Sequence, residues 1–163
     1  MDYKKAYQKL EQDSFFQSWI KKHPSICLAY LFTEINEQLE LGTWQMGFYD
    51  KKTDKIARFM IENDVRFEPL EEAFKKPGAI KELELKKVKI SAEKARDIAL
   101  AVQKEKYTQH LVQKGFLILQ HTEDIIWNIT FLTRTLAALN IKVHAISGNV
   151  IKDELMTFFD IKK

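Results

Sequence analysis

The chain has 163 residues, 45% of them hydrophobic and 30% charged, with a formal net charge of +3. This composition is that of a globular protein with an ordinary core, and it excludes a disordered chain. Residues 1–80 carry 12 basic and 13 acidic side chains, and residues 81–163 carry 14 and 10, so the concentrated basic surface of a dedicated nucleic-acid-binding protein is absent.

The sequence predicts a cytoplasmic protein that does not cross a membrane. Its lone Cys27 has no intramolecular partner and sits in an apolar run, which predicts a buried thiol. Residues Met1–Lys5 lack the apolar core of a secretory signal, and no apolar stretch approaches the length of a membrane span. A reducing compartment is therefore allowed.

The chain begins with predicted helix and continues with strand. Apolar residues recur at helical spacing through residues 3–20, where Ser14 and Gln17 have the form of a capping box, and Pro24 ends the helical pattern. The segment Ser25–Ile35 is apolar on both alternations, which is typical of a strand covered on both faces.

A hairpin is predicted next. Trp44, Met46 and Phe48 alternate with smaller or polar residues, the polar loop 50–54 follows, and residues 56–61 return as a second strand. Pro69 is expected to end this first unit.

Residues 70–89 are predicted to be a connector. A turn is expected at residues 77–78, and the apolar residues after it lie among lysines. The alternation of apolar and polar residues shifts by one position at residues 86–87. We interpret this part as an edge strand with a bulge, in which lysines discourage edge-to-edge association.

The second unit, residues 90–163, is predicted to open with a helix. Ser91 is a favourable N-cap, and small apolar residues form one stripe along the helix, so it should lie close against a sheet. Strands are expected at residues 116–120, 125–133 and 141–146, and a short closing helix around residues 155–159.

The two halves share a pattern of helix followed by strands, because the segment Trp44–Phe48 is echoed by Trp127–Phe131. We therefore predict an α+β protein of two tandem units, residues 1–69 and 90–163, each a helix packed on an antiparallel sheet. Whether the two halves form one continuous sheet or pack face to face is left open.

Residues 90–151 resemble the PepSY family of small domains. The opening segment Ile90–Ala95 reads Ile-Ser-Ala-Glu-Lys-Ala, and the closing segment Val143–Ile151 has a strand and turn of the family's form, with His144 in place of the usual Asp. A fainter version occupies residues 48–56. The resemblance implies a cystatin-like α+β fold and a non-catalytic, regulatory or inhibitory, protein-binding role.

No catalytic or metal-binding constellation stands out in the sequence. The four histidines are scattered and Cys27 has no nearby ligand partner, so no metal site is expected. The five glycines are isolated, so no nucleotide cofactor of standard form is expected either. If the protein is an enzyme with a pocket in a curved sheet, His144 is the first candidate for acid–base chemistry, although a satisfied strand histidine is the simpler interpretation.

The favoured function is a non-catalytic module that presents sheet surface to a protein or peptide, or to a second copy as a homodimer. Its candidate residues are Trp44, Phe48, Trp127 and Phe131, which belong instead to the core if each stripe packs under its helix. The first alternative is a small-molecule binder or pocket enzyme. A weaker alternative is an RNA-associated protein that uses Lys86, Lys87, Lys89 and Lys94, but nucleic-acid binding is disfavoured by the mild charge.

Overall fold

The computed structural model describes residues 1–73 and 80–157. The described helices are α1 (Tyr3–Gln12), α2 (Ser14–Lys22) and α3 (Ala92–Lys106), and a 3-10 turn, η1, spans Leu85–Lys87. The strands are β1 (Ile26–Ile35), β2 (Trp44–Asp50), β3 (Lys55–Ile61), β4 (Val65–Glu72), β5 (Val112–His121), β6 (Ile125–Thr133), β7 (Ala138–His144) and β8 (Val150–Met156).

All eight strands belong to one antiparallel sheet, in the order β4-β3-β2-β1-β5-β6-β7-β8. Each half of the chain contributes four consecutive strands, and the two groups meet where β1 pairs with β5. This seam joins Tyr30–Ile35 to Gly115–Gln120 in antiparallel register. The sheet is therefore continuous from one edge strand to the other.

The prediction of two tandem helix-on-sheet units is wrong, although the α+β class holds in the broad sense. The finding that overturns it is the single sheet, in which β1 and β5 are central strands. Separate units would leave both strands with an unpaired row of backbone N–H and C=O groups, and their mutual pairing removes two edges at once.

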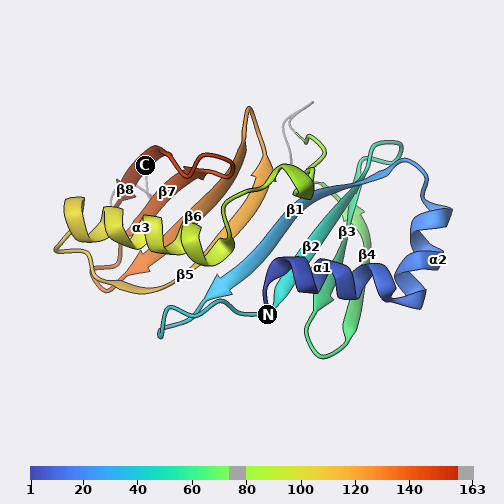
Figure 1. The fold of residues 1–163 in the computed structure, drawn as a ribbon, viewed down its shortest axis with the longest axis horizontal. Helices are drawn as coiled ribbons and strands as arrows, with labels where there is room; N and C mark the ends of the chain where they lie inside the picture. The colour runs from blue at the N-terminus through green and yellow to red at the C-terminus, as the bar shows by residue number, and fades with distance from the viewer. Residues whose placement is uncertain (74–79, 158–163) are drawn as a thin grey trace.

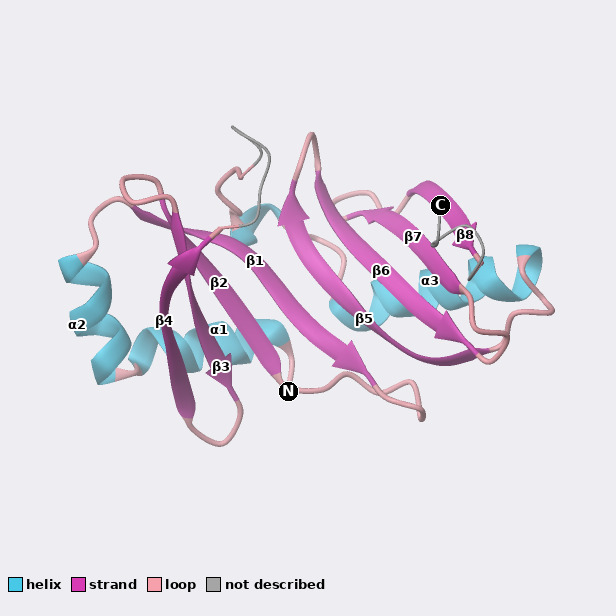
Figure 2. Cartoon of the chain, turned by 180° about the vertical axis from the view of Figure 1, so that it is seen from behind, coloured by secondary structure: helices cyan, strands magenta, loops and turns pink. Residues whose placement is uncertain are grey.

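The helices cover one face of this sheet only. Figure 1 shows α1 over the strands of the first half and α3 over those of the second, with α2 at the outer edge of the first group. Phe16 and Trp19 of α2 pack against Phe48 and Phe59 on the same side. Seen from behind in Figure 2, the other face of the sheet carries none of the described helices, and Ala73 and Ile80 pack at one end of it against Cys27, Ala29 and Tyr49. Packing on one face explains why the strands bury alternate side chains.

Tyr3 connects the two halves of the core. Its ring meets Trp44 of β2 at 5.9 Å and Trp127 of β6 at 5.7 Å between centroids, both edge to face. Each indole N–H donates to a carbonyl that lies two residues before a helix, Trp44 to Met1 at 2.8 Å and Trp127 to Ile90 at 2.9 Å. The tryptophans therefore fix the entrances of α1 and α3 as well as filling the core.

The position of α3 follows from its sequence as predicted. The Ser91 hydroxyl accepts the backbone N–H of Lys94, which caps the first turn. Ala92, Ala95 and Ala99 are fully buried, so no bulky side chain separates the helix from the sheet. Arg96 donates to the Leu39 carbonyl at 2.9 Å, and this bond ties α3 to the loop between β1 and β2.

Three local predictions fail. The lysine-rich segment forms η1 rather than an edge strand, because the Lys87 and Val88 N–H groups bond to Glu84 and Leu85, and this turn causes the phase slip. Leu155 and Met156, expected to begin a closing helix, belong instead to β8, and the rest of that predicted helix, at residues 158–159, lies outside the described residues. β4 also continues past Pro69, which lies at an irregularity of an edge strand where no ladder N–H is needed.

We expect Tyr3→Ala to lower the free energy of unfolding by about 3–5 kcal/mol, because it removes a fully buried ring between two others. Chemical denaturation followed by tryptophan fluorescence measures this change. Leu111→Ala is the matched control, since Leu111 is mostly exposed, and it should change stability by less than about 0.5 kcal/mol. Equal effects of the two substitutions would contradict the role given to Tyr3.

The edge strand β8 is held to α3 by Asp153, which accepts the Tyr107 hydroxyl and the Lys106 ammonium, the latter at 3.0 Å. These bonds, the hydroxyl first, lower the pKa of Asp153, and the same hydrogen bond raises the pKa of Tyr107 to about 12. The stabilisation is therefore fully present above the unfolded carboxyl pKa of about 3.9 and is lost as the pH falls through the lower folded value.

Asp153→Asn should therefore cost about 1–2 kcal/mol of stability at pH 7, and this cost should decrease as the pH falls from 7 through the lowered folded pKa of Asp153. Urea unfolding of both proteins across this pH range gives the two curves. A difference between them that is constant with pH would show that the charge of Asp153 contributes nothing.

Candidate functional site

We call the face of the sheet opposite the described helices the helix-free face. Cross-strand partners lie on the same face of a sheet, and one row of partners crosses all eight strands there. From β4 to β8 this row is Arg66, Met60, Gln45, Phe32, Ile118, Asn128, Lys142 and Lys152. These side chains are half-buried or exposed, whereas those of the opposite face form the core.

Polar side chains on the helix-free face bond to one another. The Tyr30 hydroxyl accepts Gln45 Nε2 at 2.8 Å and Arg58 Nε at 3.3 Å. Its ring lies across Gly47, where an added Cβ would come within 2.0 Å of it, so the glycine is required for this close approach. If a partner covered this face, the polar atoms of Tyr30, Gln45 and Arg58 would lose water but keep their hydrogen bonds to one another.

A second cluster lies on β6 and β7. Asn140 Nδ2 donates to Asn128 Oδ1 at 2.7 Å and to Thr130 Oγ1 at 3.0 Å. Together with the Tyr30 cluster, it places satisfied polar groups on both sides of the β1–β5 seam.

Apolar side chains occupy the centre and one corner of the helix-free face. The rings of Phe32 and Phe116 meet across the seam at 5.8 Å between centroids. Leu132 and Met156 are exposed, and both lie beside Ala138 of the strand between them. The face is not flat, because a hollow of about 390 Å³ lies beside Phe32 and Met60.

Charges on this face divide at the seam. The β1–β4 side carries two arginines and four glutamates, namely Arg58, Arg66, Glu34, Glu62, Glu68 and Glu71. The β5–β8 side carries three lysines and one glutamate, namely Lys114, Lys142, Lys152 and Glu154. Arg58 is already paired, at 3.5 Å with Glu68 and 3.2 Å with Glu71, and Lys152 lies 3.4 Å from Glu154. One side is therefore net negative and the other net positive.

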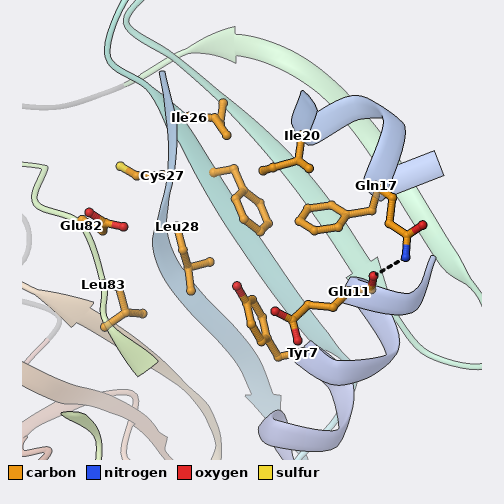
Figure 3. Close-up of a pocket in the computed structure, with 11 residues that line it drawn as sticks. Tyr7, Glu11, Gln17, Ile20, Ile26, Cys27, Leu28, Glu82 and Leu83 are labelled. Atoms are coloured by element: carbon orange, nitrogen blue, oxygen red, sulfur yellow. Dashed lines mark hydrogen bonds between the residues drawn. The ribbon is translucent and has the colours of Figure 1, made fainter. Parts of the chain in front are cut away.

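The helix side of the sheet holds a groove of about 410 Å³ (Figure 3). One wall is formed by α1 and α2, the other by the segment that precedes η1, and the floor by β1 and β2. Its apolar lining comes mainly from Phe16, Ile20, Ile26, Leu28, Phe48 and Leu83, and its polar lining from Tyr7, Glu11, Gln17 and Glu82. We call this site the acidic groove.

The acidic groove exists because β1 separates from β5. Their pairing starts at Tyr30, and before that residue the Leu28 carbonyl accepts the Leu83 N–H at 2.8 Å. The segment at residues 82–83 therefore takes the place beside β1 that a paired strand would fill. Glu82 is held there through its carbonyl, which lies 2.9 Å from His121 Nδ1.

The four aromatic residues proposed for partner binding are buried. Trp44, Trp127 and Phe131 have no exposed surface and Phe48 is 2% exposed. They lie on the helix side of the sheet, where the core interpretation of the sequence placed them, and Phe48 also lines the acidic groove. In this structure, these four residues do not form an exposed surface that a partner protein could contact.

His144 lies at the end of β7. Its Nδ1 accepts the N–H groups of Ile146 at 3.3 Å and Ser147 at 3.1 Å, and its Nε2 is 3.8 Å from Asp124 Oδ1. It lines neither the acidic groove nor the hollow on the helix-free face. The ring organises the turn between β7 and β8.

The four lysines proposed as a basic patch are all exposed. Lys86 and Lys87 lie in η1, Lys89 just after it, and Lys94 in the first turn of α3. Lys87 is paired with Glu84 at 2.9 Å, which reduces the charge available to a phosphate.

Within residues 1–73 and 80–157, no group of three or more His, Cys, Asp or Glu side chains is placed to hold a metal ion. In the same part of the chain, no helix is both long enough and apolar enough to span a membrane.

Comparison with known proteins shows a similar fold and no family. The structure is similar to a crystal structure of a "putative lipoprotein" from Clostridium difficile 630, with a TM-score of 0.54 and 16% sequence identity, over 90% of this chain and 97% of that chain. No family model and no curated protein sequence matches this chain. At this identity the similarity concerns the fold alone.

Sequence reasoning missed both the helix-free face and the acidic groove. The alternation in β1 and β5 identifies the residues of each face but not which face the helices leave bare. The groove combines α1, α2, β1, β2 and the segment at residue 82, which are far apart in sequence. The sequence contains one weak indication of the groove: Tyr7 and Glu11 are four residues apart and so share one face of α1.

Proposed function

We propose that this chain is a non-catalytic binding module that presents its helix-free face to a protein, and that the partner is a second copy of the chain. The observation that carries the proposal is the one-sided placement of the helices over an eight-stranded sheet. The uncovered side bears rings, exposed aliphatic groups and polar groups that are already paired, which is the mixture found in protein interfaces.

The helix-free face is large enough for a stable interface. Strands about 4.8 Å apart give an eight-stranded sheet a width of roughly 34 Å, and strands of seven residues are roughly 23 Å long. The resulting area is at most about 800 Å², the contribution of each partner to an interface of standard size; Ala73 and Ile80 already cover the part of it at Cys27 and Tyr49.

The charge division favours a second copy over an unrelated protein. Two sheets can pack face to face with nearly aligned strands. If a two-fold axis runs along the β1–β5 seam between them, the negative β1–β4 side of one copy lies over the positive β5–β8 side of the other. The same contact then forms twice, as in an isologous dimer.

The alternatives have less support. A pocket enzyme that uses His144 is disfavoured because this ring serves the β7–β8 turn and lines neither larger hollow. An RNA-binding role for the four lysines is disfavoured because Lys87 is paired with Glu84. The PepSY resemblance of residues 90–151 implies the same protein-binding role and stays part of this proposal, without support from a family match.

We further propose a cytoplasmic location, which the lone and buried Cys27 supports. The description of the similar structure as a "putative lipoprotein" favours attachment to a membrane surface instead. Fractionation of the native cells separates the two: recovery of the chain with the membranes would contradict the cytoplasmic location.

Sedimentation equilibrium of the purified chain should show a monomer–dimer equilibrium that weakens when the salt concentration rises from 50 to 500 mM. Lys142→Glu combined with Lys152→Glu should weaken association by about tenfold or more, because each substitution replaces attraction by repulsion across the interface.

The matched control is Lys5→Glu combined with Lys104→Glu, which makes the same change of net charge on exposed positions of α1 and α3. This control should leave the dimer nearly unchanged. A monomer at every concentration, or equal weakening by both pairs, would overturn the proposal.

A further inference from the structure

The acidic groove is a second site, on the opposite side of the sheet from the helix-free face, and it is independent of the function proposed above. Its volume of about 410 Å³ falls in the lower part of the range of small-molecule sites. A hollow of this size with an apolar floor accommodates a small organic molecule.

The apolar part of the groove is formed by side chains from three elements. Phe16 and Ile20 come from α2, Leu28 from β1 and Phe48 from β2. In Figure 3 the rings of the pocket and the side chains of Ile20, Ile26 and Leu28 surround a common space. An apolar group placed there would be removed from water on several sides.

The polar part of the groove is negative. Glu11 of α1 and Glu82 line it, and a shallower hollow continues past Glu82 to Glu84 and Lys86. Glu84 is paired with Lys87. Among the residues that line the main hollow there is no lysine or arginine, although Lys51 acts electrostatically on Cys27 from outside it.

The negative charge of the groove affects the pKa of Tyr7. Burial raises the pKa of its hydroxyl, and the charges of Glu11 and then Glu82 raise it further. The hydroxyl therefore stays protonated at neutral pH and can donate or accept a hydrogen bond in the groove that Glu11 and Glu82 also line. Its ring adds an aromatic surface, which attracts a cation as well.

We propose that the acidic groove binds a small organic ammonium ion, with its apolar body on the Phe16–Phe48 floor and its charged head between Glu11 and Glu82. An anion of the same shape would meet two carboxylates, and a neutral molecule would gain only the apolar contact. The site therefore selects ligands by charge as well as by shape.

The test compares three probes that share a phenyl body: 2-phenylethylammonium, 2-phenylethanol and phenylacetate. Each is titrated at pH 7 and constant ionic strength into the isotope-labelled full chain, and amide shifts are followed by two-dimensional NMR. The ammonium probe should shift the amides of Gln17, Cys27 and Leu83 at the lowest concentration, followed by the alcohol, with phenylacetate weakest.

Glu11→Gln combined with Glu82→Gln should weaken binding of the ammonium probe by about three- to tenfold, since exposed charges contribute modestly, and should leave 2-phenylethanol unchanged. Glu105→Gln combined with Glu123→Gln, at exposed positions outside the groove, is the matched control and should change neither probe.

Three outcomes would overturn the proposal. They are equal affinity for all three probes, shifts that map away from the groove, and equal weakening by the control pair. Unchanged amide shifts outside the groove confirm that each variant is folded. None of these outcomes bears on dimer formation, which the variants at Lys142 and Lys152 test separately.

Discussion

The structure depends on the antiparallel pairing of β1 with β5. Six residue pairs, from Tyr30 with Gln120 to Ile35 with Gly115, turn two groups of four strands into one sheet. Tyr3 supports this seam on the helix side because it packs against one tryptophan from each group. Phe32 and Phe116 support it on the other side. Long-range strand pairing carries a high entropic cost, so the rings on both sides stabilise the contact that most needs support.

Both proposed binding sites follow from where this seam begins and ends. Over its paired length it makes the helix-free face continuous and sets a net negative group of strands beside a net positive one. Before Tyr30 the pairing stops, β1 turns away from β5, and the segment at Glu82 and Leu83 fills part of the gap. The remaining space is the acidic groove. A protein site and a small-ligand site can therefore coexist on opposite sides of one sheet.

The local structure could be predicted where a few neighbouring residues decide it. Ser91 caps α3, the polar loop 51–54 joins β2 to β3, one residue shorter than predicted because Asp50 ends β2, and the alternation from Trp44 to Phe48 identifies the buried side of β2. The prediction failed at Lys86 and Lys87, because a phase slip in an apolar pattern fits a bulge and a 3-10 turn equally well.

The sites could not be predicted, because they depend on contacts between distant segments. β1 is apolar on both alternations, which predicts a strand covered on both faces. This holds on the helix side, where Leu31 and Ile35 are buried, but Phe32 on the helix-free face is only half-buried, and the pattern does not identify the neighbouring strand. Trp44 and Trp127 stand out by size, and the sequence allows them either as partner contacts or as core; both are fully buried, since rings of this size bring a large apolar area to a core. Tyr7 and Glu82 looked ordinary in sequence, and their proximity comes only from the separation of β1 and β5.

The central claim is that the two halves share one sheet through β1 and β5. Cross-strand nuclear Overhauser effects between backbone protons of residues 30–35 and 115–120 test it most directly. The account predicts a ladder of such contacts in which Phe32 faces Ile118 and Glu34 faces Phe116. Complete ladders within each group of four strands, with no contact between these two segments, would contradict it.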